Sequence, residues 1–214
     1  MTDKIKHVTF DLDGTLINSG STIYKTTLKA LNVLNIKAVI KEKEFNRMIG
    51  AHFINIFNEL KIVVKDIDQF IEIYKGFYFD FIDDSKFYPG VIEILQYLHQ
   101  KKIYVSLLTT KSQDQAEKII QHFNLDSYFN FVMGRREGIG HKPLADPLLF
   151  ICKELSIKTE ETMMVGDTEL DIICGENANA STCAVTYGYR SKEKLEEHKP
   201  DYIISDLLEL KEIL

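Results

Sequence analysis

Proline and cysteine are scarce in this chain of 214 residues. Its four prolines leave little room for an extended linker. Its three cysteines, Cys152, Cys174 and Cys183, form no C-x-x-C pair, and cysteines and histidines together do not fall at zinc-ligand spacings. We therefore expect reduced thiols, which fit a cytoplasmic protein, and no zinc site.

Long apolar runs and clustered positive charge are also missing. No apolar run approaches the roughly eighteen residues of a membrane span, and the segment MTDKIKHVTFD at 1–11 lacks the apolar stretch of a signal peptide. Lys and Arg total 26 against 32 Asp and Glu, which gives a formal net charge of −6 without a basic tail. We expect a cytoplasmic protein that binds neither membrane nor nucleic acid, and the oligomeric state stays open.

Strand and helix patterns alternate through most of the chain, of which 45% is hydrophobic. The segment PGVIEILQYLHQKK at 89–102 has apolar residues at helical spacing, with Pro and Gly as its start signal. Five apolar runs read as short strands of a buried parallel sheet, at 8–10, 103–108, 162–165, 182–185 and 202–204. This alternation predicts an α/β fold with a doubly wound parallel sheet, a Rossmann-like core.

One block interrupts the alternation. Between residues 17 and 85 the pattern is helical throughout, and in STIYKTTLKALNVL the side chains of Tyr24, Leu28 and Leu31 share a face. No strand is evident there. We therefore expect a core formed by 1–16 and 86–214 and an inserted small all-helical domain at 17–85.

Two aspartates stand one residue apart where the first strand ends, in HVTFDLDGTLINS. Residues i and i+2 of a strand point to one face, so Asp11 and Asp13 can converge there, and Gly14 lets the chain turn. Ligands of open α/β sheets bind outside the carboxyl ends of the strands. Four other polar residues fall at similar positions: Thr109, Lys142, Asp167 and Asp171. The spacing of Asp167 and Asp171 is i, i+4, so we expect both on one side of a helix's first turn.

Several carboxylates cannot gather at one place without compensation, because like charges at close range repel each other. A divalent cation is the natural remedy, and ligation by oxygen atoms alone suits Mg²⁺. Such a set can act on phosphorus: one aspartate attacks, a second carboxyl protonates the leaving oxygen and later activates water, and the cation and a lysine hold the negative charge.

Each feature alone has a plainer structural explanation. Asp13 and Gly14 form a common turn dipeptide, Asp167 or Thr168 can cap a helix, and Lys142 can be a solvated loop residue. The combination is far more specific, because D-x-D-G-T after one strand precedes G-D-x-x-x-D after another, with a lysine between them. We therefore favour the functional interpretation.

At these residues the sequence resembles the haloacid dehalogenase-like hydrolases, specifically the phosphoglycolate-phosphatase-like branch with a helical cap. The resemblance covers nearly the whole chain. DLDGT at 11–15 is similar to the first motif of the family, which implies that Asp11 is the nucleophile and Asp13 the general acid and base. YPGV at 88–91 and AVTYGYRS at 184–191 are similar to further landmarks.

The resemblance implies roles for the remaining polar residues. Thr109 in LLTTK would be the phosphate-binding hydroxyl and Lys142 in HKP the charge-neutralising lysine. Asp167 and Asp171 in GDTELD would be the acidic pair of the metal site.

The implied activity is a Mg²⁺-dependent phosphatase that acts on a small phosphorylated metabolite through an aspartyl-phosphate. Mg²⁺ would bind Asp11, the backbone carbonyl of Asp13, and Asp167. The sequence does not indicate which phosphate ester is the substrate, whether phosphoglycolate, a sugar phosphate, a nucleotide or pyrophosphate.

Residues of the helical block resemble the substrate-facing loop of the family's cap. Arg47, Gly50 and His52 in NRMIGAHF would face the substrate, where a cation can hold a carboxylate or a second phosphate. The alternative is an exposed Arg47 at the start of a helix.

Three positions depart from the pattern of the family. Thr110 stands where many relatives carry Asn; it stays a substrate-binding candidate without the amide contact. Ala145 replaces a frequent proline, and Asn179 replaces a frequent glycine. Because asparagine tolerates the left-handed region, we expect the turn at Asn179 to persist.

Other activities are less favoured by the sequence. A halide leaving group needs no proton, so Asp13 favours phosphate chemistry over dehalogenation. STIYKTT at 21–27 lacks the histidine of the beta-phosphoglucomutase-like cap stretch, which disfavours a phosphosugar mutase, while a pyrophosphatase stays open. A regulatory module that binds a phosphate ligand without turnover ranks lower, because every residue that the reaction needs is present.

Overall fold

A computed structural model describes residues 5–214 of the chain. They form two compact units: unit 1 comprises the described residues up to Leu16 together with Tyr88–Leu214, and unit 2 comprises Ile17–Phe87. Within this described range, the helices are too short or too polar to cross a membrane.

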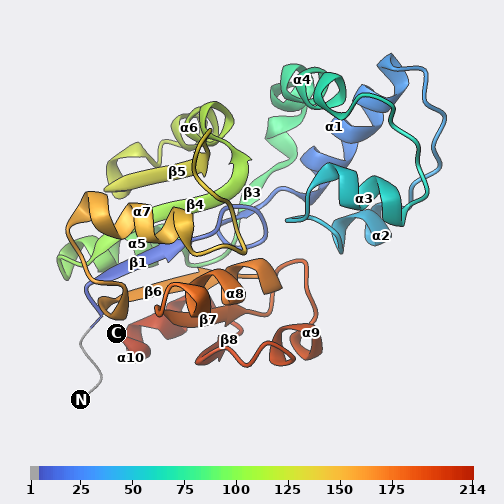
Figure 1. The fold of residues 1–214 in the computed structure, drawn as a ribbon. Coiled ribbons are helices and arrows are strands. Elements are labelled where there is room, and N and C mark those ends of the chain that lie inside the picture. Colours follow the sequence, from blue (N-terminus) through green and yellow to red (C-terminus); the bar gives the residue numbers. More distant parts are fainter. Residues whose placement is uncertain (1–4) are drawn as a thin grey trace. The chain divides into compact units, whose positions relative to one another are not determined.

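Unit 1 is built on a six-stranded parallel sheet with the order β5-β4-β1-β6-β7-β8. The predicted doubly wound α/β fold is confirmed. From the central β1 the chain moves to β4 and β5 on one side and to β6, β7 and β8 on the other, so right-handed crossovers place helices on both faces (Figure 1). The strands span His7–Phe10 (β1), Tyr104–Ser112 (β4), Phe131–Arg135 (β5), Thr162–Gly166 (β6), Ser181–Val185 (β7) and Tyr202–Ile204 (β8).

The helices of unit 1 cover this sheet with apolar faces. Side chains of α7 and α8, such as Leu148, Ile151 and Cys174, join those of β4, β5 and β6 in one buried cluster. Asn179, just after α8, has φ of 56°, so the expected left-handed turn is confirmed. The helices span Val91–Gln100 (α5), Gln113–His122 (α6), Asp146–Leu155 (α7), Glu169–Asn177 (α8), Lys192–Glu196 (α9) and Leu210–Ile213 (α10), with 3-10 turns at Asp126–Tyr128, Thr159–Glu161 and Leu207–Glu209.

Strand β5 was not expected from the sequence. It lies at the edge of the sheet and is only partly buried, so its apolar run is short. It also contains Gly134, where a side chain would meet the backbone of Gln113 at 2.6 Å, so the glycine allows the start of α6 to approach the strand closely.

Unit 2 is mainly helical, with α1 (Gly20–Val33), α2 (Glu42–Asn46), α3 (Phe53–Glu59), α4 (Ile67–Phe77) and a 3-10 segment at Tyr78–Asp84. The expectation of no strand in this block is wrong, because β2 (Ile17–Asn18) pairs antiparallel with β3 (Lys86–Phe87). Strands of two residues are too short to produce a recognisable alternation.

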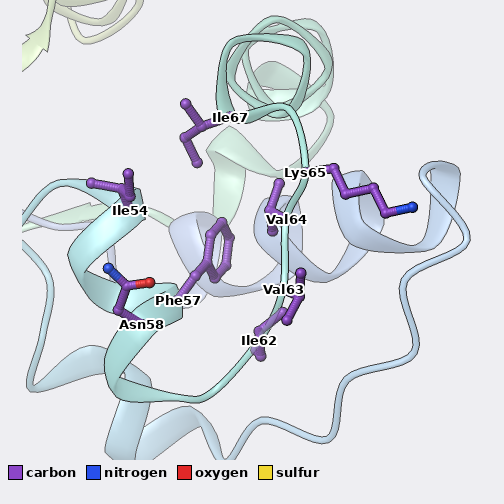
Figure 2. Close-up of a pocket in the computed structure, with 8 residues that line it drawn as sticks. All are labelled: Ile54, Phe57, Asn58, Ile62, Val63, Val64, Lys65 and Ile67. Carbon is purple, nitrogen blue, oxygen red and sulfur yellow. The ribbon is translucent and has the colours of Figure 1, made fainter.

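Aromatic rings form much of the core of unit 2. Phe70 lies 5.0 Å from Phe53 and 4.8 Å from Phe57, ring centre to ring centre, in edge-to-face contacts. Figure 2 shows a pocket beside this core, lined mainly by apolar side chains of α3 and of the segment that leads into α4, including Val64. The sequence-predicted site residues do not line this pocket.

Candidate active site

Asp11 and Asp13 follow β1 directly, at the carboxyl end of the central strand. The backbone N–H of Asp11 donates to the carbonyl of Val165 at 2.9 Å, which extends the pairing of β1 with β6 by one residue. Because the strand order reverses around β1, this position is the switch point where α/β sheets bind ligands. Both residues are buried: Asp11 is 6% exposed and Asp13 is 7% exposed.

Lys142 joins two carboxylates at the centre of the site. Its Nζ lies 2.6 Å from Oδ1 of Asp11 and 2.5 Å from Oδ1 of Asp171, and its side chain is buried in the loop before α7. Burial alone would lower the pKa of Lys142, but the two carboxylates outweigh it and raise the pKa above its usual value. The lysine is therefore a fixed positive charge.

Asp167 lies in a slot that two glycines make possible. A side chain at either Gly14 or Gly188 would collide with the Asp167 carboxylate, and Gly14 also has φ of 91°. The backbone N–H of Tyr189 donates to Oδ2 at 2.7 Å and the Thr15 hydroxyl donates to Oδ1 at 3.3 Å. Residues of two landmark stretches thus hold this carboxylate, which sequence reasoning did not anticipate.

Asp171 sits in the first turn of α8, but Asp167 does not, so the expected placement of both in one helical turn is wrong. Asp167 precedes Thr168, the N-terminal cap of the helix, because the chain is still extended there. Oδ2 of Asp171 accepts hydrogen bonds from the Thr168 backbone N–H at 3.0 Å and hydroxyl at 2.7 Å. Asp171 therefore links the cap of α8 to Lys142.

Three of these carboxylates can hold a cation. Asp11, Asp167 and Asp171 each offer an oxygen, and these oxygens all lie within 4.8 Å of one another. Burial raises the pKa of Asp11 to about 7 against the pull of Lys142, and the charges of Asp171 and Asp13 act in the same direction as burial. Burial, with Asp11 and Asp171, likewise raises the pKa of Asp167 well above its usual range. A buried all-oxygen set of this kind fits a hard divalent cation.

Three more polar residues stand at the end of β4: Thr109 is buried, Thr110 is half-buried, and only 8% of the Lys111 side chain is exposed. The pairing of β4 with β5 is irregular between Leu108 and Ser112, and such bulges re-aim side chains. Lys111 Nζ lies 3.0 Å from Oδ2 of Asp13. Lys111 was not among the residues predicted from the sequence, although it lies two residues after Thr109.

The remaining candidates lie in unit 2, on the connection between α2 and α3. Arg47 is exposed, as in the alternative interpretation, but it ends α2 and does not begin a helix. Gly50 has φ of 98°, and His52 is the N-terminal cap residue of α3. The chain therefore turns between Arg47 and His52.

Comparisons with known proteins agree with this architecture. Residues 8–185 match the family model of the haloacid dehalogenase-like hydrolases. The chain is 32% identical to the pyrophosphatase PpaX of Bacillus mycoides over 212 residues, which cover 99% of this chain and 97% of the relative.

Solved structures share the whole fold. A predicted phosphatase from Clostridium acetobutylicum is 27% identical, with a TM-score of 0.87 and 99% of each chain covered. A predicted phosphoglycolate phosphatase from Haemophilus somnus is 24% identical, with a TM-score of 0.85 over 98% of this chain and 97% of the other, so in fold the chain resembles that branch. The chain belongs to the haloacid dehalogenase-like hydrolases.

Proposed function

We propose that the protein is a Mg²⁺-dependent phosphatase that hydrolyses a small phosphorylated metabolite through an aspartyl-phosphate on Asp11. The observation that carries the proposal is the buried contact of Lys142 with both Asp11 and Asp171 at the carboxyl end of β1. Burying a cation and two carboxylates costs desolvation free energy, and such perturbed charged groups cluster at functional sites.

Two displacements at phosphorus account for the reaction. An Asp11 oxygen attacks the phosphorus, the bond from phosphorus to the leaving oxygen breaks, and Asp13 gives its proton to that oxygen. Water then attacks the aspartyl-phosphate, Asp13 takes a proton from the water, and the bond from phosphorus to Asp11 breaks. Inorganic phosphate leaves, and both aspartates return to their starting state.

The other residues hold charge during these steps. Thr109 and Lys142 would bind the phosphoryl oxygens, and Lys142 also orients Asp11 through their 2.6 Å contact. Mg²⁺, held by Asp11, Asp167 and the backbone carbonyl of Asp13, would supply positive charge for the phosphoryl group. Asp171 would act as the supporting acidic residue, since its two oxygens already bond Lys142 and Thr168.

The charges of the group support a divalent ion. Four carboxylates, Asp11, Asp13, Asp167 and Asp171, are buried beside two lysines, Lys111 and Lys142. When all four carboxyls are ionised, their negative charges exceed the two positive charges of the lysines by two, which one divalent cation balances.

We also propose that unit 2 is the cap and selects the substrate, through Arg47, Gly50 and His52. A lost charged contact is worth on the order of 1.5 to 3 kcal/mol, so Arg47→Ala and His52→Ala should each lower kcat/KM for the best natural substrate roughly ten- to a hundredfold. Turnover of an aryl phosphate should change little. Equal losses on both substrates would assign these residues to the fold, and no loss on either would leave them without a role in substrate selection.

Pyrophosphate is a second candidate substrate, because the relatives at 32% identity are named pyrophosphatases. A phosphosugar mutase has less support, since STIYKTT at 21–27 contains no histidine. A regulatory module without turnover has the least support, since the reacting residues lie together. Phosphate release from pyrophosphate and from a panel of phosphorylated metabolites, each with Mg²⁺, would rank these candidates.

Asp11→Asn tests the proposed nucleophile. We expect turnover to fall by at least about a thousandfold, because an amide oxygen is a poor nucleophile, while the fold stays intact by circular dichroism. Asp126→Asn, at an exposed aspartate of unit 1, is the matched control. An Asp11→Asn variant with near wild-type activity would show that the assignment is wrong.

A further inference from the structure

A second buried lysine, Lys111, lies beside the candidate active site. Its Nζ contacts Oδ2 of Asp13 at 3.0 Å, and only 8% of the Lys111 side chain and 9% of the Asp13 side chain are exposed. Lysines are almost never buried to this extent without a charged partner. The contact is therefore a built ion pair and not a solvated surface pair, which would contribute little.

The charges nearby explain what the pair does. Asp13 lies close enough to Asp11 for the two charges to act on each other. Lys142 already contacts Asp11 and Asp171. Lys111 supplies a positive charge at Asp13, which offsets the repulsion between this carboxyl and the neighbouring carboxylates.

The backbone around Lys111 is fixed at the same time. The N–H of Lys111 donates to the Thr109 hydroxyl oxygen at 3.3 Å, within the irregular end of β4. One short segment therefore presents both the proposed phosphate-binding hydroxyl and the lysine that contacts Asp13. A change in the position of Lys111 would move both groups.

We propose that Lys111 is a positioning residue, which holds the Asp13 carboxyl where it exchanges a proton with the leaving oxygen and later with water. The inference rests on the proposed function, since it assumes that Asp13 is the acid and base. The contact with Lys111 uses Oδ2 of Asp13 and so fixes the orientation of this carboxyl. Lys111 itself forms and breaks no bond.

Two substrates separate this role from a merely structural one. Phenyl phosphate has a basic leaving oxygen that needs a proton, whereas 2,4-dinitrophenyl phosphate has a leaving group that departs without one. Hydrolysis of the aspartyl-phosphate needs Asp13 as a base with both substrates. The variants are Lys111→Met, which removes the charge, Lys111→Arg, which keeps it, and Lys118→Met, at an exposed lysine of α6.

For Lys111→Met we expect kcat with phenyl phosphate to fall roughly ten- to a hundredfold, part of the 10²–10⁴ that general acid and base catalysis contributes. With 2,4-dinitrophenyl phosphate, rapid mixing should show a burst of about one dinitrophenolate per active site, followed by slow turnover as the aspartyl-phosphate accumulates. Lys111→Arg should recover most of the activity, and Lys118→Met should match the wild type.

A double-mutant comparison tests whether Lys111 acts through Asp13. In an Asp13→Asn background, Lys111→Met should cause no further loss, because the group that it positions no longer exchanges a proton. A further loss as large as that in the wild type would overturn the proposal. So would equal losses on both substrates with a reduced burst, which would indicate a role in folding, or a higher KM with unchanged kcat, which would place Lys111 on the substrate.

The same experiment keeps the two proposals apart. A wild-type protein without phosphatase activity, or an active Asp11→Asn variant, contradicts the proposed function whatever Lys111 does. An active wild type with a silent Asp11→Asn variant and an unaffected Lys111→Met variant contradicts only the role of Lys111.

Discussion

Strands β1, β4 and β6 bury polar groups in two places, and the two sets are compensated in opposite ways. Within the strands, His7 Nε2 lies 2.8 Å from the Ser106 hydroxyl and Nδ1 lies 3.1 Å from the Thr162 hydroxyl. Ser106 in turn donates to the Thr9 hydroxyl at 2.7 Å. This hydroxyl network is neutral and satisfies its own hydrogen bonds, so it needs nothing from outside the chain.

At the carboxyl ends of the same strands the polar groups are ionisable, and the acidic groups outnumber the basic ones. Four buried carboxyls lie beside Lys111 and Lys142, so their full ionisation leaves two negative charges in excess. The difference teaches that burial of polar groups alone does not mark a site in this sheet. A group of buried carboxyls that outnumbers the lysines beside it does mark a candidate site.

The two sets also respond to pH with opposite sign when no metal is bound. Burial lowers the pKa of His7 to about 4, so the unfolded chain takes up a proton first and the free energy of unfolding falls as pH drops from about 6.5 to 4. Burial raises the pKa of Asp11 to about 7, so its contribution is present at low pH and is lost as pH rises toward 7. The two effects oppose each other in one pH range.

Removal of the metal should produce the largest difference between the two sets, because only the carboxylates at the strand ends need a cation. EDTA should abolish phosphatase activity and Mg²⁺ should restore it. Mg²⁺ at about a hundred times its Kd should also raise the free energy of unfolding by roughly 2.7 kcal/mol. Both responses should disappear in Asp167→Asn and persist in the exposed control Asp126→Asn.

The outcome is measured by phosphate release and by thermal unfolding with and without Mg²⁺. Full activity after exhaustive chelation, or restoration by Zn²⁺ alone, would contradict an all-oxygen Mg²⁺ site. A gain in stability that Asp167→Asn retains would place the bound ion somewhere else on the protein.

Sequence patterns predicted the strands that position this site better than the contacts between its side chains. The buried strands β1, β6 and β7 were recognisable because apolar runs of three or four residues stand between helical patterns, and β1 and β6 place Asp11 and Asp167. The edge strand β5 was missed because Gly134 interrupts its apolar run, whereas β8 at the opposite edge was predicted although it is shorter and more exposed. Local spacing thus recognises an uninterrupted apolar run, whether it lies in the middle of the sheet or at its edge.

The contacts between the site residues had no sequence signal of their own. Lys111 and Asp13 are 98 positions apart, and their pairing depends on an irregularity at the end of β4 that no periodicity announces. The fit of Asp167 against Gly14 and Gly188 likewise arises only from folding. Gly14 was recognisable as a turn residue, whereas Gly188 and Lys111 were not singled out, because a partner is a property of the tertiary structure.

The neutral network around His7 should have a smaller effect, on the dependence of stability on pH. The difference between the usual pKa of histidine, 6.5, and about 4 in the fold corresponds to at most roughly 3 kcal/mol. His7→Gln keeps a hydrogen-bonding group toward Ser106 and takes up no proton, so in EDTA it should lose the fall in unfolding free energy between pH 6.5 and 4 that His7 causes. His99→Gln, at an exposed histidine of α5, should keep the wild-type profile. Urea unfolding at several pH values measures both, and NMR titration of the His7 ring in the wild type serves if the variant is too unstable. A His7 ring that takes up its proton near pH 6.5 in the folded protein, or a variant whose profile matches the wild type, would show that the neutral network does not control acid stability.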